Sequence, residues 1–374
     1  FVIDELTFLL KAMVICSATA AMLMSMEYLK TSMLNIFEYS ILILLSTISM
    51  LLLISSYDFI SMYLAIEMQS LCFYVLAASK RHSEFSTEAG LKYFLLGAFS
   101  SGVLLFGCSL VYGYTGITNF EDIAKCLAGS ALFQTHHSFL HLGMCLIMIG
   151  FLFKLTAAPF HFWAPDVYEG SPTAVTLFFA IVPKVAALTV FIRFLYIPFV
   201  NMIDQWQPIL IFLSIASMIF GAIAAIGQNN LKRLIAYSSI GHMGYALAGL
   251  STGSNEGIQS SIVYMSIYLV MNLAFFSCLL MLKRNDAYYE TIDDLSGLSK
   301  NHPILSLSLL AILFSLAGIP PLAGFFAKFY IFKAVIEQSM YFLAIVGLLS
   351  TVIAAFYYLK IIKVIYFDKG NRER

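Results

Sequence analysis

Long apolar stretches follow one another along almost the whole chain, and they constrain its fold more than any other feature. Eleven of them are long enough to cross a bilayer, for which about 20 residues suffice as a helix. Because a segment in contact with lipid must satisfy its own backbone hydrogen bonds, we expect each stretch to be helical. The predicted spans are 6–28, 37–55, 59–79, 90–112, 139–162, 172–197, 207–226, 234–250, 257–282, 303–337 and 341–366.

The composition excludes a soluble domain. Hydrophobic residues make up 60% of the 374 residues and charged residues only 11%, whereas soluble domains carry about 25% charged residues. The formal net charge is zero, so nothing points to a nucleic-acid partner. The six cysteines are scattered without a CxxC pair, and the chain has no GxGxxG or P-loop motif. We therefore predict an all-α, polytopic membrane helix bundle that holds no cofactor.

Three histidines lie close together in the sequence, at His136, His137 and His141. A metal site usually needs further ligands, and no carboxylate or cysteine beside them completes one. We therefore predict no metal ion.

Positive charges are unevenly divided between the two ends of the predicted spans. If the spans alternate in direction, one side collects twelve Lys and Arg residues and the other little beyond Lys125. This asymmetry follows the positive-inside rule. It also supports the number of spans, because one miscounted span would place the later positive charges on the other side. Phe1 is then expected on the outer side of the membrane. The twelve residues of the inner side are Lys30, Lys80, Arg81, Lys92, Lys232, Arg233, Lys283, Arg284, Lys300, Lys369, Arg372 and Arg374.

The spacing of the spans indicates an internal repeat. Lys154 and Lys328 are 174 residues apart, and adding this offset to the span 37–55 gives a position close to the span 207–226. Each unit holds five spans, an odd number, so the second unit starts from the opposite side, as in the inverted repeats of transporters. We predict a leading helix and loop in 1–36, a first five-helix repeat in 37–200, an inverted second five-helix repeat in 201–367 and a polar tail in 368–374.

Prolines are expected to interrupt two of the spans. A Pro-Pro pair at 320–321 lies in the middle of the stretch 303–337, which is too long for one straight span. Proline lacks the N–H that a helix needs, so the carbonyls of Leu316 and Ala317 should lose their usual partners. Pro159 should act in the same way on the fifth span. Interrupted backbone is tolerated in a membrane where it lines a cavity, so these breaks predict a site near the midplane.

Four ionisable side chains lie deep within the predicted spans: Glu67, Lys154, Lys184 and Lys328. A charge at this depth costs roughly 2.5–3.5 kcal/mol on insertion scales, and such residues usually face a bundle interior and mark ion or proton routes. The apolar surroundings favour the neutral form of each group, whereas a neighbouring opposite charge favours the ionised form. Each group can therefore exchange a proton when the charge of its neighbour changes.

His242 lies in the eighth predicted span, and a histidine can relay protons between lysines because an imidazole titrates near neutral pH. Structural interpretations of these residues stay open. Glu67 can form a static ion pair, Lys154 can snorkel to the membrane interface, and His242 can be a hydrogen-bonded residue of the core. Lys184 and Lys328 can each be a charge that satisfies a partner at a helix contact. Arg193, near a span end, is expected to snorkel.

Four runs of sequence carry a family resemblance. They resemble NADH–quinone oxidoreductase subunit 2, an antiporter-like membrane subunit of respiratory complex I, most closely in its mitochondrial form from plants and green algae. The resemblance covers about residues 37–367. The runs are 65–71 (AIEMQSL), 153–173 (FKLTAAPFHFWAPDVYEGSPT), 230–245 (NLKRLIAYSSIGHMGY) and 317–330 (AGIPPLAGFFAKFY).

The resemblance implies a role for each buried charge. The family's counterpart of Glu67 pairs with that of Lys154, and the counterpart of Lys184 continues a polar line through His242 to Lys328. Such subunits are taken to translocate protons across the mitochondrial inner membrane, driven by quinone chemistry elsewhere in the complex. This implies a non-redox subunit of H⁺-translocating NADH:ubiquinone reductase, with lipids and other membrane-arm subunits, including antiporter-like ones, as partners.

The chain departs from the family plan at its ends. The longer members are expected to have two further helices before residue 6 and one after residue 374. This difference concerns the ends of the chain and leaves the two predicted repeats unchanged.

Two other functions are consistent with the same buried charges. A free-standing cation/proton antiporter would use them in a similar way, although no Asp cluster for a metal cation lies within the spans. A passive membrane scaffold would use them only to lock the packing of its helices. Replacing Lys154 by Met separates a scaffold, which would lose assembly, from a pump subunit, which would assemble and lose proton transfer.

Overall fold

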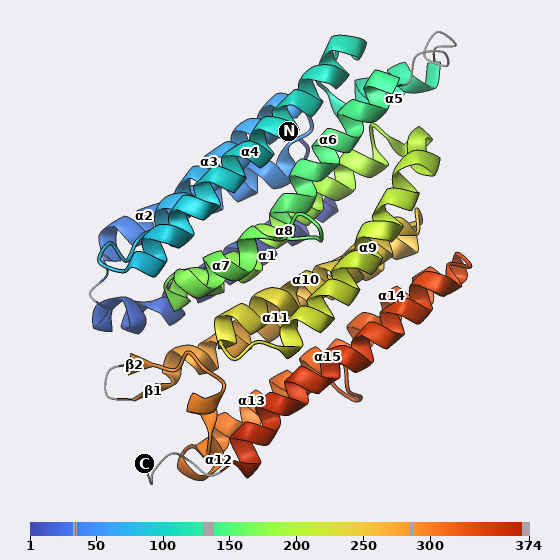
Figure 1. Cartoon of the computed structure of the whole chain (residues 1–374). Helices are drawn as coiled ribbons and strands as arrows, with labels where there is room; N and C mark the ends of the chain where they lie inside the picture. The colour runs from blue at the N-terminus through green and yellow to red at the C-terminus, as the bar shows by residue number, and fades with distance from the viewer. Residues whose placement is uncertain (33, 35, 130–137, 285–286, 369–374) are drawn as a thin grey trace.

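The structure is a computed structural model that describes residues 1–32, 34, 36–129, 138–284 and 287–368. Long helices lie side by side, and most of them extend from one end of the molecule to the other (Figure 1). The helices are α1 (Glu5–Thr31), α2 (Ile36–Ser55), α3 (Phe59–Ala77), α4 (Glu84–Thr115), α5 (Phe120–Gly129), α6 (Ser138–Lys154), α7 (Trp163–Gly170), α8 (Thr173–Tyr196), α9 (Ile203–Ile226), α10 (Leu231–Ser251), α11 (Asn255–Met281), α12 (Leu298–Asn301), α13 (Pro303–Ala317), α14 (Ala323–Glu337) and α15 (Tyr341–Phe367).

The connections contain little other regular structure. Two short 3-10 turns are η2 (Val200–Met202) and η3 (Asp293–Leu295), and one antiparallel pair of two-residue strands is β1 (Lys283–Arg284) and β2 (Ala287–Tyr288). The prediction of an all-α membrane helix bundle is confirmed.

Ten of the eleven predicted spans coincide with one helix or with a pair of short helices, whereas the span 139–162 holds α6 and the non-helical residues that follow it. Among the described residues, eight helices are long and apolar enough to cross a membrane alone. Two further spans are interrupted: the span 139–162 holds α6 and ends just before α7, and the span 303–337 holds α13 and α14. The remaining span is α10, which is long enough but contains Lys232, Arg233 and several serines and glycines. These residues lower the mean hydropathy of α10.

The first interruption is longer than the sequence predicts. We expect one helix over 139–162, but α6 ends at Lys154 and α7 begins at Trp163. Thr156 adopts a positive φ of 60°, which a β-branched residue in a helix does not take, and Pro159 cannot donate a backbone hydrogen bond. The helix therefore stops directly after the lysine.

The second interruption lies in the predicted place. α13 ends at Ala317, and Gly318 follows with a φ of 88°, a conformation that glycine adopts without steric cost. α14 begins at Ala323, so Lys328 lies after this break, whereas Lys154 lies before the first one. The offset of 174 residues therefore superposes the two lysines but not the two breaks.

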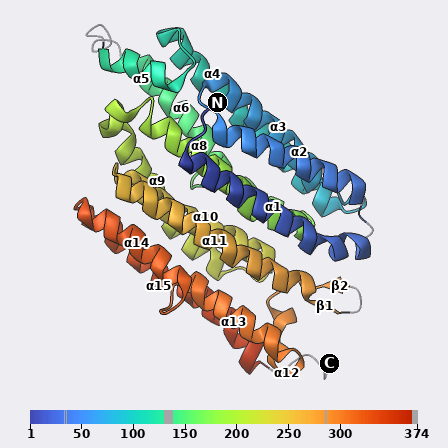
Figure 2. The same ribbon diagram turned by 180° about the vertical axis from the view of Figure 1, so that it is seen from behind.

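α8 is the central helix of the bundle. Every residue from Thr173 to Leu195 is buried, as expected for a helix that is apolar on all sides. α1, α2, α6, α10 and α11 all contact it. Figure 2 shows α1 on the outside, where it covers α8 from one side. Lys184 lies near the middle of this buried helix.

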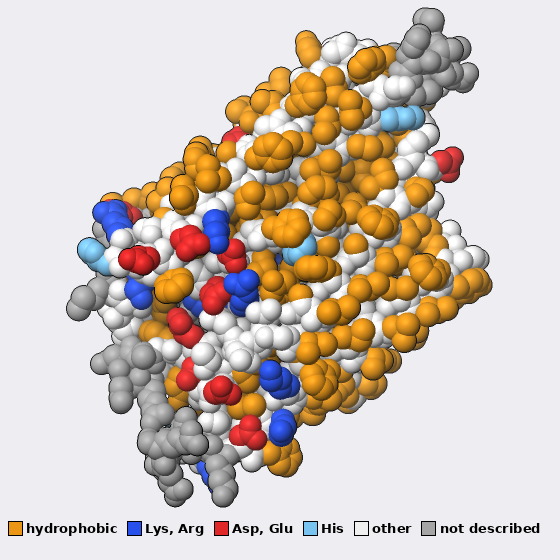
Figure 3. Space-filling view, viewed as in Figure 1, with side chains coloured by type: hydrophobic (Ala, Val, Ile, Leu, Met, Phe, Trp, Pro, Cys, Tyr) orange, Lys and Arg blue, Asp and Glu red, His pale blue; other side chains and the backbone are white. Residues whose placement is uncertain are grey.

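The two series of helices run in opposite directions. α2 begins at the end of the molecule that carries β1 and β2, whereas α9 begins at the opposite end (Figure 1). Lys, Arg, Asp and Glu side chains gather at the β1–β2 end (Figure 3). There Asp166 binds Lys92 at 2.9 Å and Arg233 at 3.0 Å, which joins α7 to α4 and to α10. The two series are thus linked at the end that the sequence assigns to the positive side.

Arg193, near the end of α8, does not snorkel, so that prediction is wrong. Its buried guanidinium donates to the carbonyl of Ile54 at 2.8 Å and to the Asp4 carboxylate at 2.8 Å. Asp4 also caps α1 by accepting from the Thr7 amide. Partial burial acts to raise the pKa of Asp4, but hydrogen bonds from Thr7 and the charge of Arg193 outweigh it and lower the pKa. This contact fixes the start of α1 against α8.

Candidate functional site

Lys328 is buried on α14, directly after the second break. Its Nζ donates to the carbonyl of Ala317 at 3.1 Å and to that of Leu316 at 3.4 Å. These are the two carbonyls that the sequence predicts to be left without helical partners, and this prediction is confirmed. The helix dipole of α13 favours a cation at this position. The ammonium also lies 5.1 Å from the ring centroid of Tyr245.

Tyrosine side chains connect Lys328 with His242. The ring centroids of Tyr245 and Tyr264 are 5.9 Å apart, and the Tyr264 hydroxyl lies 2.6 Å from Nδ1 of His242. On the other side of the imidazole, the Tyr358 hydroxyl lies 3.0 Å from Nε2. One nitrogen of a neutral imidazole donates and the other accepts, so the two hydroxyls exchange roles when the tautomer changes.

A small cavity lies between Lys328 and His242. Its volume is about 10 Å³, and Ser238 and Tyr358 help to line it. This volume is near the lower limit for holding one water molecule, about 10–15 Å³, and the lining supplies polar partners. A single water there would lie beside the Lys328 ammonium and the hydroxyl of Tyr358, which itself contacts Nε2 of His242.

Lys184 lies between two tyrosine rings in the middle of α8. Its Nζ is 5.9 Å from the ring centroid of Tyr168 and 5.8 Å from that of Tyr268. Among the described residues this buried ammonium has no hydrogen-bond partner. The Tyr268 ring also lies 5.2 Å from the His242 ring. Tyr268 therefore stands between Lys184 and His242.

Pro183 explains why two tyrosines stand beside Lys184. Proline has no N–H, so the carbonyl of Phe179, four residues earlier, loses its helical partner. The Tyr168 hydroxyl donates to that carbonyl at 3.3 Å, and the Tyr268 hydroxyl donates to the next one, Ala180, at 3.4 Å. Both hydroxyls are thereby held against α8 one turn before the lysine.

Lys154, Ser70 and Glu67 form a second group at the first break. The Nζ of Lys154 donates to Oγ of Ser70 at 2.7 Å. Glu67 lies one turn before Ser70 on α3, and its buried Oε1 has no hydrogen-bond partner in the described part of the chain. No direct ion pair between Glu67 and Lys154 is present there, and the lysine bonds to Ser70 instead. Ser70 thus occupies the place beside Lys154 that the family pairing gives to Glu67.

Aromatic rings fill the space between the two groups. Phe153 lies under the Lys154 ammonium at 5.8 Å, and its ring is 5.5 Å from that of Trp163. Trp163 is in turn 6.3 Å from Tyr168, the ring beside Lys184. Within the described ranges no side-chain hydrogen bond joins Lys154 to Lys184. The structure therefore brings Lys184, His242 and Lys328 together through tyrosines, and Lys154 reaches them only through rings.

Sequence reasoning missed the tyrosines and Ser70. Tyr264 and Tyr268 are four residues apart, so both lie on one face of α11, and this spacing is a signal that could have identified them. Ser70 follows Glu67 by three residues and could have been found in the same way. Tyr358 and Tyr245 offer no such signal, because their contacts come from distant parts of the chain.

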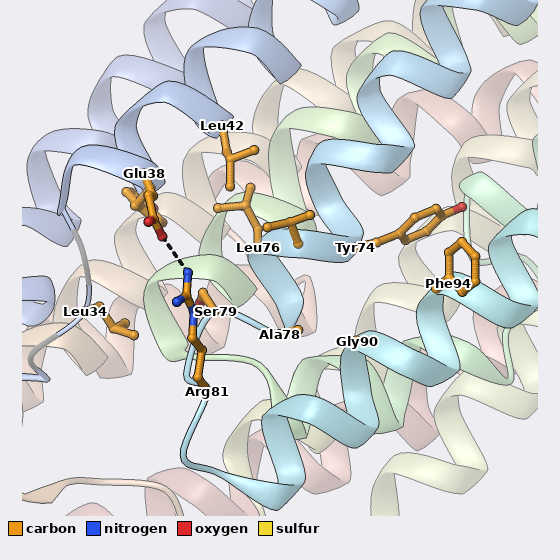
Figure 4. A pocket seen from close by; sticks show the side chains of 12 residues that line it. Leu34, Glu38, Leu42, Tyr74, Leu76, Ala78, Ser79, Arg81, Gly90 and Phe94 are labelled. Carbon is orange, nitrogen blue, oxygen red and sulfur yellow. Dashed lines mark hydrogen bonds and ion pairs between the residues drawn. The ribbon is translucent and has the colours of Figure 1, made fainter.

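A larger cavity of about 330 Å³ lies away from this line, between α2, α3 and α4. Figure 4 shows Arg81 and Glu38 at its edge, where they form an ion pair of 3.1 Å, and Tyr74 beside Phe94 on another side. None of the predicted site residues lines it.

Of the three clustered histidines, His141 lies in α6, whereas His136 and His137 lie outside the described residues. Lys369, Arg372 and Arg374, which the sequence assigns to the inner side, also lie outside them.

Comparisons with known proteins agree on one family. The family model described as "NADH:quinone oxidoreductase/Mrp antiporter, TM" matches residues 56–354. The "NADH-quinone oxidoreductase subunit N" of Pelagibacter ubique is 74% identical over 99% of this chain and 77% of its own length. The "NADH-ubiquinone oxidoreductase chain 2" of Marchantia polymorpha is 54% identical over 98% of this chain and 75% of its own length.

A solved structure with the same fold comes from respiratory complex I of Thermus thermophilus with bound aureothin. The match has a TM-score of 0.81 at 30% sequence identity and covers 98% of this chain and 77% of that one. Both the sequence and the fold therefore place the chain in the NADH:quinone oxidoreductase/Mrp antiporter membrane family.

Proposed function

We propose that the chain is a proton-translocating membrane-arm subunit of an NADH:quinone oxidoreductase, the respiratory complex I. The observation that carries this proposal is the buried line from Lys184 past Tyr268 and His242 to Lys328. Ionisable groups in a membrane are costly, and here three of them are connected by tyrosines and by a cavity of water size. The relatives named as subunits of this enzyme support the assignment to the complex.

In this proposal the chain supplies no redox centre and binds no cofactor. Oxidation of NADH and reduction of the quinone belong to other subunits, and this chain takes part as a non-redox subunit of an H⁺-translocating reaction. Its partners are lipids and the other membrane-arm subunits of the complex, including neighbouring antiporter-like ones.

Buried charges can pass a signal along the line because they interact strongly. Two unit charges at an effective dielectric near 20 interact by roughly 4 kcal/mol at 4 Å and by roughly 2 kcal/mol at 8 Å, and the latter separation is the better guide for groups that have a ring between them. A proton that arrives on Lys184 therefore disfavours a second positive charge on His242 or Lys328. Lys328 then releases its proton, and its neutral amine takes up the next one, with the carbonyls of Leu316 and Ala317 placed to accept hydrogen bonds from the ammonium that forms again.

Glu67 and Lys154 begin the line at the first break. When Glu67 approaches the lysine, the carboxylate stabilises the ammonium, and when it withdraws the proton becomes free to move on. The next step crosses the rings of Phe153, Trp163 and Tyr168, which carry few polar atoms. We propose that water must enter between these rings before a proton passes from Lys154 to Lys184, which makes this step the gate of the line.

We also propose the division into two inverted units, 37–200 and 201–367, with a leading helix and loop in 1–36 and a polar tail in 368–374. The order of elements supports it, because each series consists of three long helices, an interrupted span and a final long helix. The opposite directions of α2 and α9 agree with the inversion (Figure 1).

The chain belongs to a family of multi-pass membrane proteins, and we propose that its membrane is one that carries respiration. The Marchantia polymorpha relative supports the mitochondrial inner membrane expected from the sequence. The greater identity to the Pelagibacter ubique relative supports a bacterial plasma membrane instead. Immunodetection of the chain in isolated mitochondria or in bacterial membranes distinguishes the two locations.

The function is tested by replacing Lys154 with Met in the assembled complex, reconstituted into vesicles. We expect the complex to assemble and the number of protons moved per NADH oxidised to fall. The control is Lys300→Met, because Lys300 is exposed on α12 and outside the line. If Lys154→Met leaves the ratio of protons to electrons unchanged, the proposed function is wrong.

Purification tests the alternative of a free-standing cation/proton antiporter. An antiporter would run alone or with copies of itself, whereas a complex I subunit would run within a very large assembly that oxidises NADH. Migration of the mildly solubilised chain on a native gel, with an in-gel test for NADH oxidation, gives the answer.

A further inference from the structure

We propose that Ser70 is a positioning residue that holds the Lys154 ammonium whenever Lys154 is separated from Glu67. The inference rests on the proposed proton-translocating function. It adds that Ser70 competes with Glu67 for the ammonium of Lys154. In this view Lys154 alternates between two acceptors on one helix, the charged Glu67 and the neutral Ser70.

The hydrogen bonds fix the role of each atom. An ammonium can only donate, so in the 2.7 Å contact Lys154 donates and Ser70 Oγ accepts. The hydroxyl proton of Ser70 is used elsewhere, because Oγ donates to the carbonyl of Ile66 at 2.7 Å. That second bond turns the lone pairs of Oγ toward the lysine. Ser70 is therefore oriented as an acceptor.

The two acceptors are within reach of the same ammonium. Glu67 precedes Ser70 by three residues, so the two side chains lie on one face of α3, about one turn or 5 Å apart along the axis. A lysine side chain has four rotatable carbons and can cover such a distance. The buried Oε1 of Glu67 has no partner in the described part of the chain, so the carboxylate stands ready for the lysine.

The facing helix α4 offers further polar atoms at this level. Gly150 of α6 lies against Leu104, and Gly97 lies against Tyr74 of α3, at distances that leave no room for a Cβ. In this antiparallel packing Lys154 and Ser70 lie opposite Ser100 and Ser101. Both of these hydroxyls are buried without partners in the described chain. Since the ammonium has three N–H groups and Ser70 takes one, these hydroxyls, or water beside them, can receive the others.

The two positions of the lysine have different consequences for its proton. Beside Glu67 the negative charge stabilises the ammonium, which holds the proton. Beside Ser70 the ammonium keeps a hydrogen bond but loses the compensating charge, so the proton leaves more readily. Without Ser70 the separated ammonium would have to lie unpaired in the apolar bundle, which is costly. Ser70 thus makes separation of the ion pair accessible.

The test compares variants of the assembled complex in vesicles, with Lys154→Met as the reference for complete loss of transport through this subunit. We expect Ser70→Ala to slow that transport about tenfold, because loss of a charge-assisted hydrogen bond shifts an equilibrium by about this factor or more. Ser70→Thr keeps the hydroxyl and should restore the rate. The matched control is Ser46→Ala, because Ser46 is equally buried and, within the described part of the chain, its hydroxyl bonds only to a carbonyl of its own helix, that of Ile43.

A second variant and a spectroscopic measurement separate positioning from packing. Ser70→Cys keeps the size of the side chain but offers a poor acceptor, so it should be slow like Ser70→Ala even if the alanine variant fails to assemble. Infrared difference spectra should show the Glu67 carboxylate band, identified with Glu67→Gln, shifted in Ser70→Cys toward the lysine-paired form. Ser46→Ala should leave the band in place.

The outcomes distinguish this inference from the function on which it rests. Unchanged proton transport in Lys154→Met would overturn both. Loss of transport in Lys154→Met, together with normal transport and an unshifted carboxylate band in Ser70→Cys, would overturn only the role of Ser70. Slow transport in Ser70→Cys with recovery in Ser70→Thr is the result that supports it.

Discussion

Replacing Lys184 by Met and replacing Lys328 by Met are expected to change the stability of the subunit in opposite directions. Both ammonium groups are buried in the membrane part of the bundle, but the structure gives them different partners. Methionine preserves most of the length of a lysine side chain and removes its charge. The change in the free energy of unfolding therefore reports what each ammonium contributes to stability.

For Lys184 the cost of burying the charge exceeds the energy of its contacts. Placing a lysine at the centre of a span costs roughly 2.5–3.5 kcal/mol. The rings of Tyr168 and Tyr268, at 5.9 Å and 5.8 Å, return roughly 0.5–1 kcal/mol each. Among the described residues no hydrogen bond adds to this. We expect Lys184→Met to stabilise the subunit by about 1–2 kcal/mol while proton transport through it stops.

For Lys328 the energy of its contacts exceeds the cost of burying the charge. The cost of burial is the same, but two hydrogen bonds from a charged group to the carbonyls of Ala317 and Leu316 return roughly 1.5–3 kcal/mol each. Tyr245 adds a cation–π contact at 5.1 Å. Lys328→Met also leaves two carbonyls at the break without a donor. We expect this variant to destabilise the subunit by about 1–3 kcal/mol.

The assay is the temperature at which the chain leaves the assembled complex, followed on native gels for both variants and for the control Lys300→Met. A change of 1 kcal/mol corresponds to roughly 2–4 °C in domains of 150–250 residues. The temperature of Lys184→Met should therefore lie a few degrees above that of the control, and the temperature of Lys328→Met a few degrees below it. If Lys184→Met lowers the temperature as much as Lys328→Met, then Lys184 is a structural cation and the reasoning about its role fails.

Three further predictions concern single contacts. Arg193→Leu should lower the free energy of unfolding by roughly 1–2 kcal/mol, because Asp4 is 45% exposed, whereas the hydrogen bond to the carbonyl of Ile54 is buried. Since the pKa of Asp4 is lowered in the folded chain, the contribution of the ion pair should be present above about pH 4 and lost as the pH falls through that lowered pKa. Thermal stability of both forms at neutral and acid pH checks this, and an undiminished difference in acid would contradict it. Tyr358→Phe removes the hydroxyl beside Nε2 of His242 and should slow proton transport in vesicles roughly tenfold, whereas an unchanged rate would exclude Tyr358 from the line. Thr156→Gly should raise the thermal stability by roughly 1 kcal/mol, because glycine relieves the positive φ of 60° and the buried threonine hydroxyl has no partner in the described chain. A fall would mean that the packing lost with the buried threonine side chain outweighs the relief of the backbone.

The membrane fold could be predicted from the sequence because its causes are local. Apolar length alone locates the spans, and Pro320 and Pro321 alone require the second break. The first break is less predictable, since the helix stops at Lys154, five residues before Pro159. That stop depends on the backbone of Thr156, which composition does not reveal.

The candidate site could be predicted only in part. The charges of Glu67, Lys154, Lys184 and Lys328 stand out because their surroundings are apolar, but their partners are ordinary polar residues. Ser70 and Lys154 are 84 residues apart, so their hydrogen bond depends on how α3 and α6 both pack against α4. The hydroxyl of Tyr358 reaches His242 from a helix more than 100 residues away. Such contacts follow from tertiary packing, which a single sequence does not specify.

The central claim is that the buried charges lie along a hydrated line inside the bundle. A high-resolution density map of the assembled complex tests it most directly, at the cavity of about 10 Å³ between Lys328 and His242 and beside the Lys154–Ser70 hydrogen bond. We predict ordered water within hydrogen-bond distance of Lys328, of the Tyr358 hydroxyl beside His242 and of Glu67. Dry contacts at all of these places, with the lysine side chains facing lipid, would contradict the account.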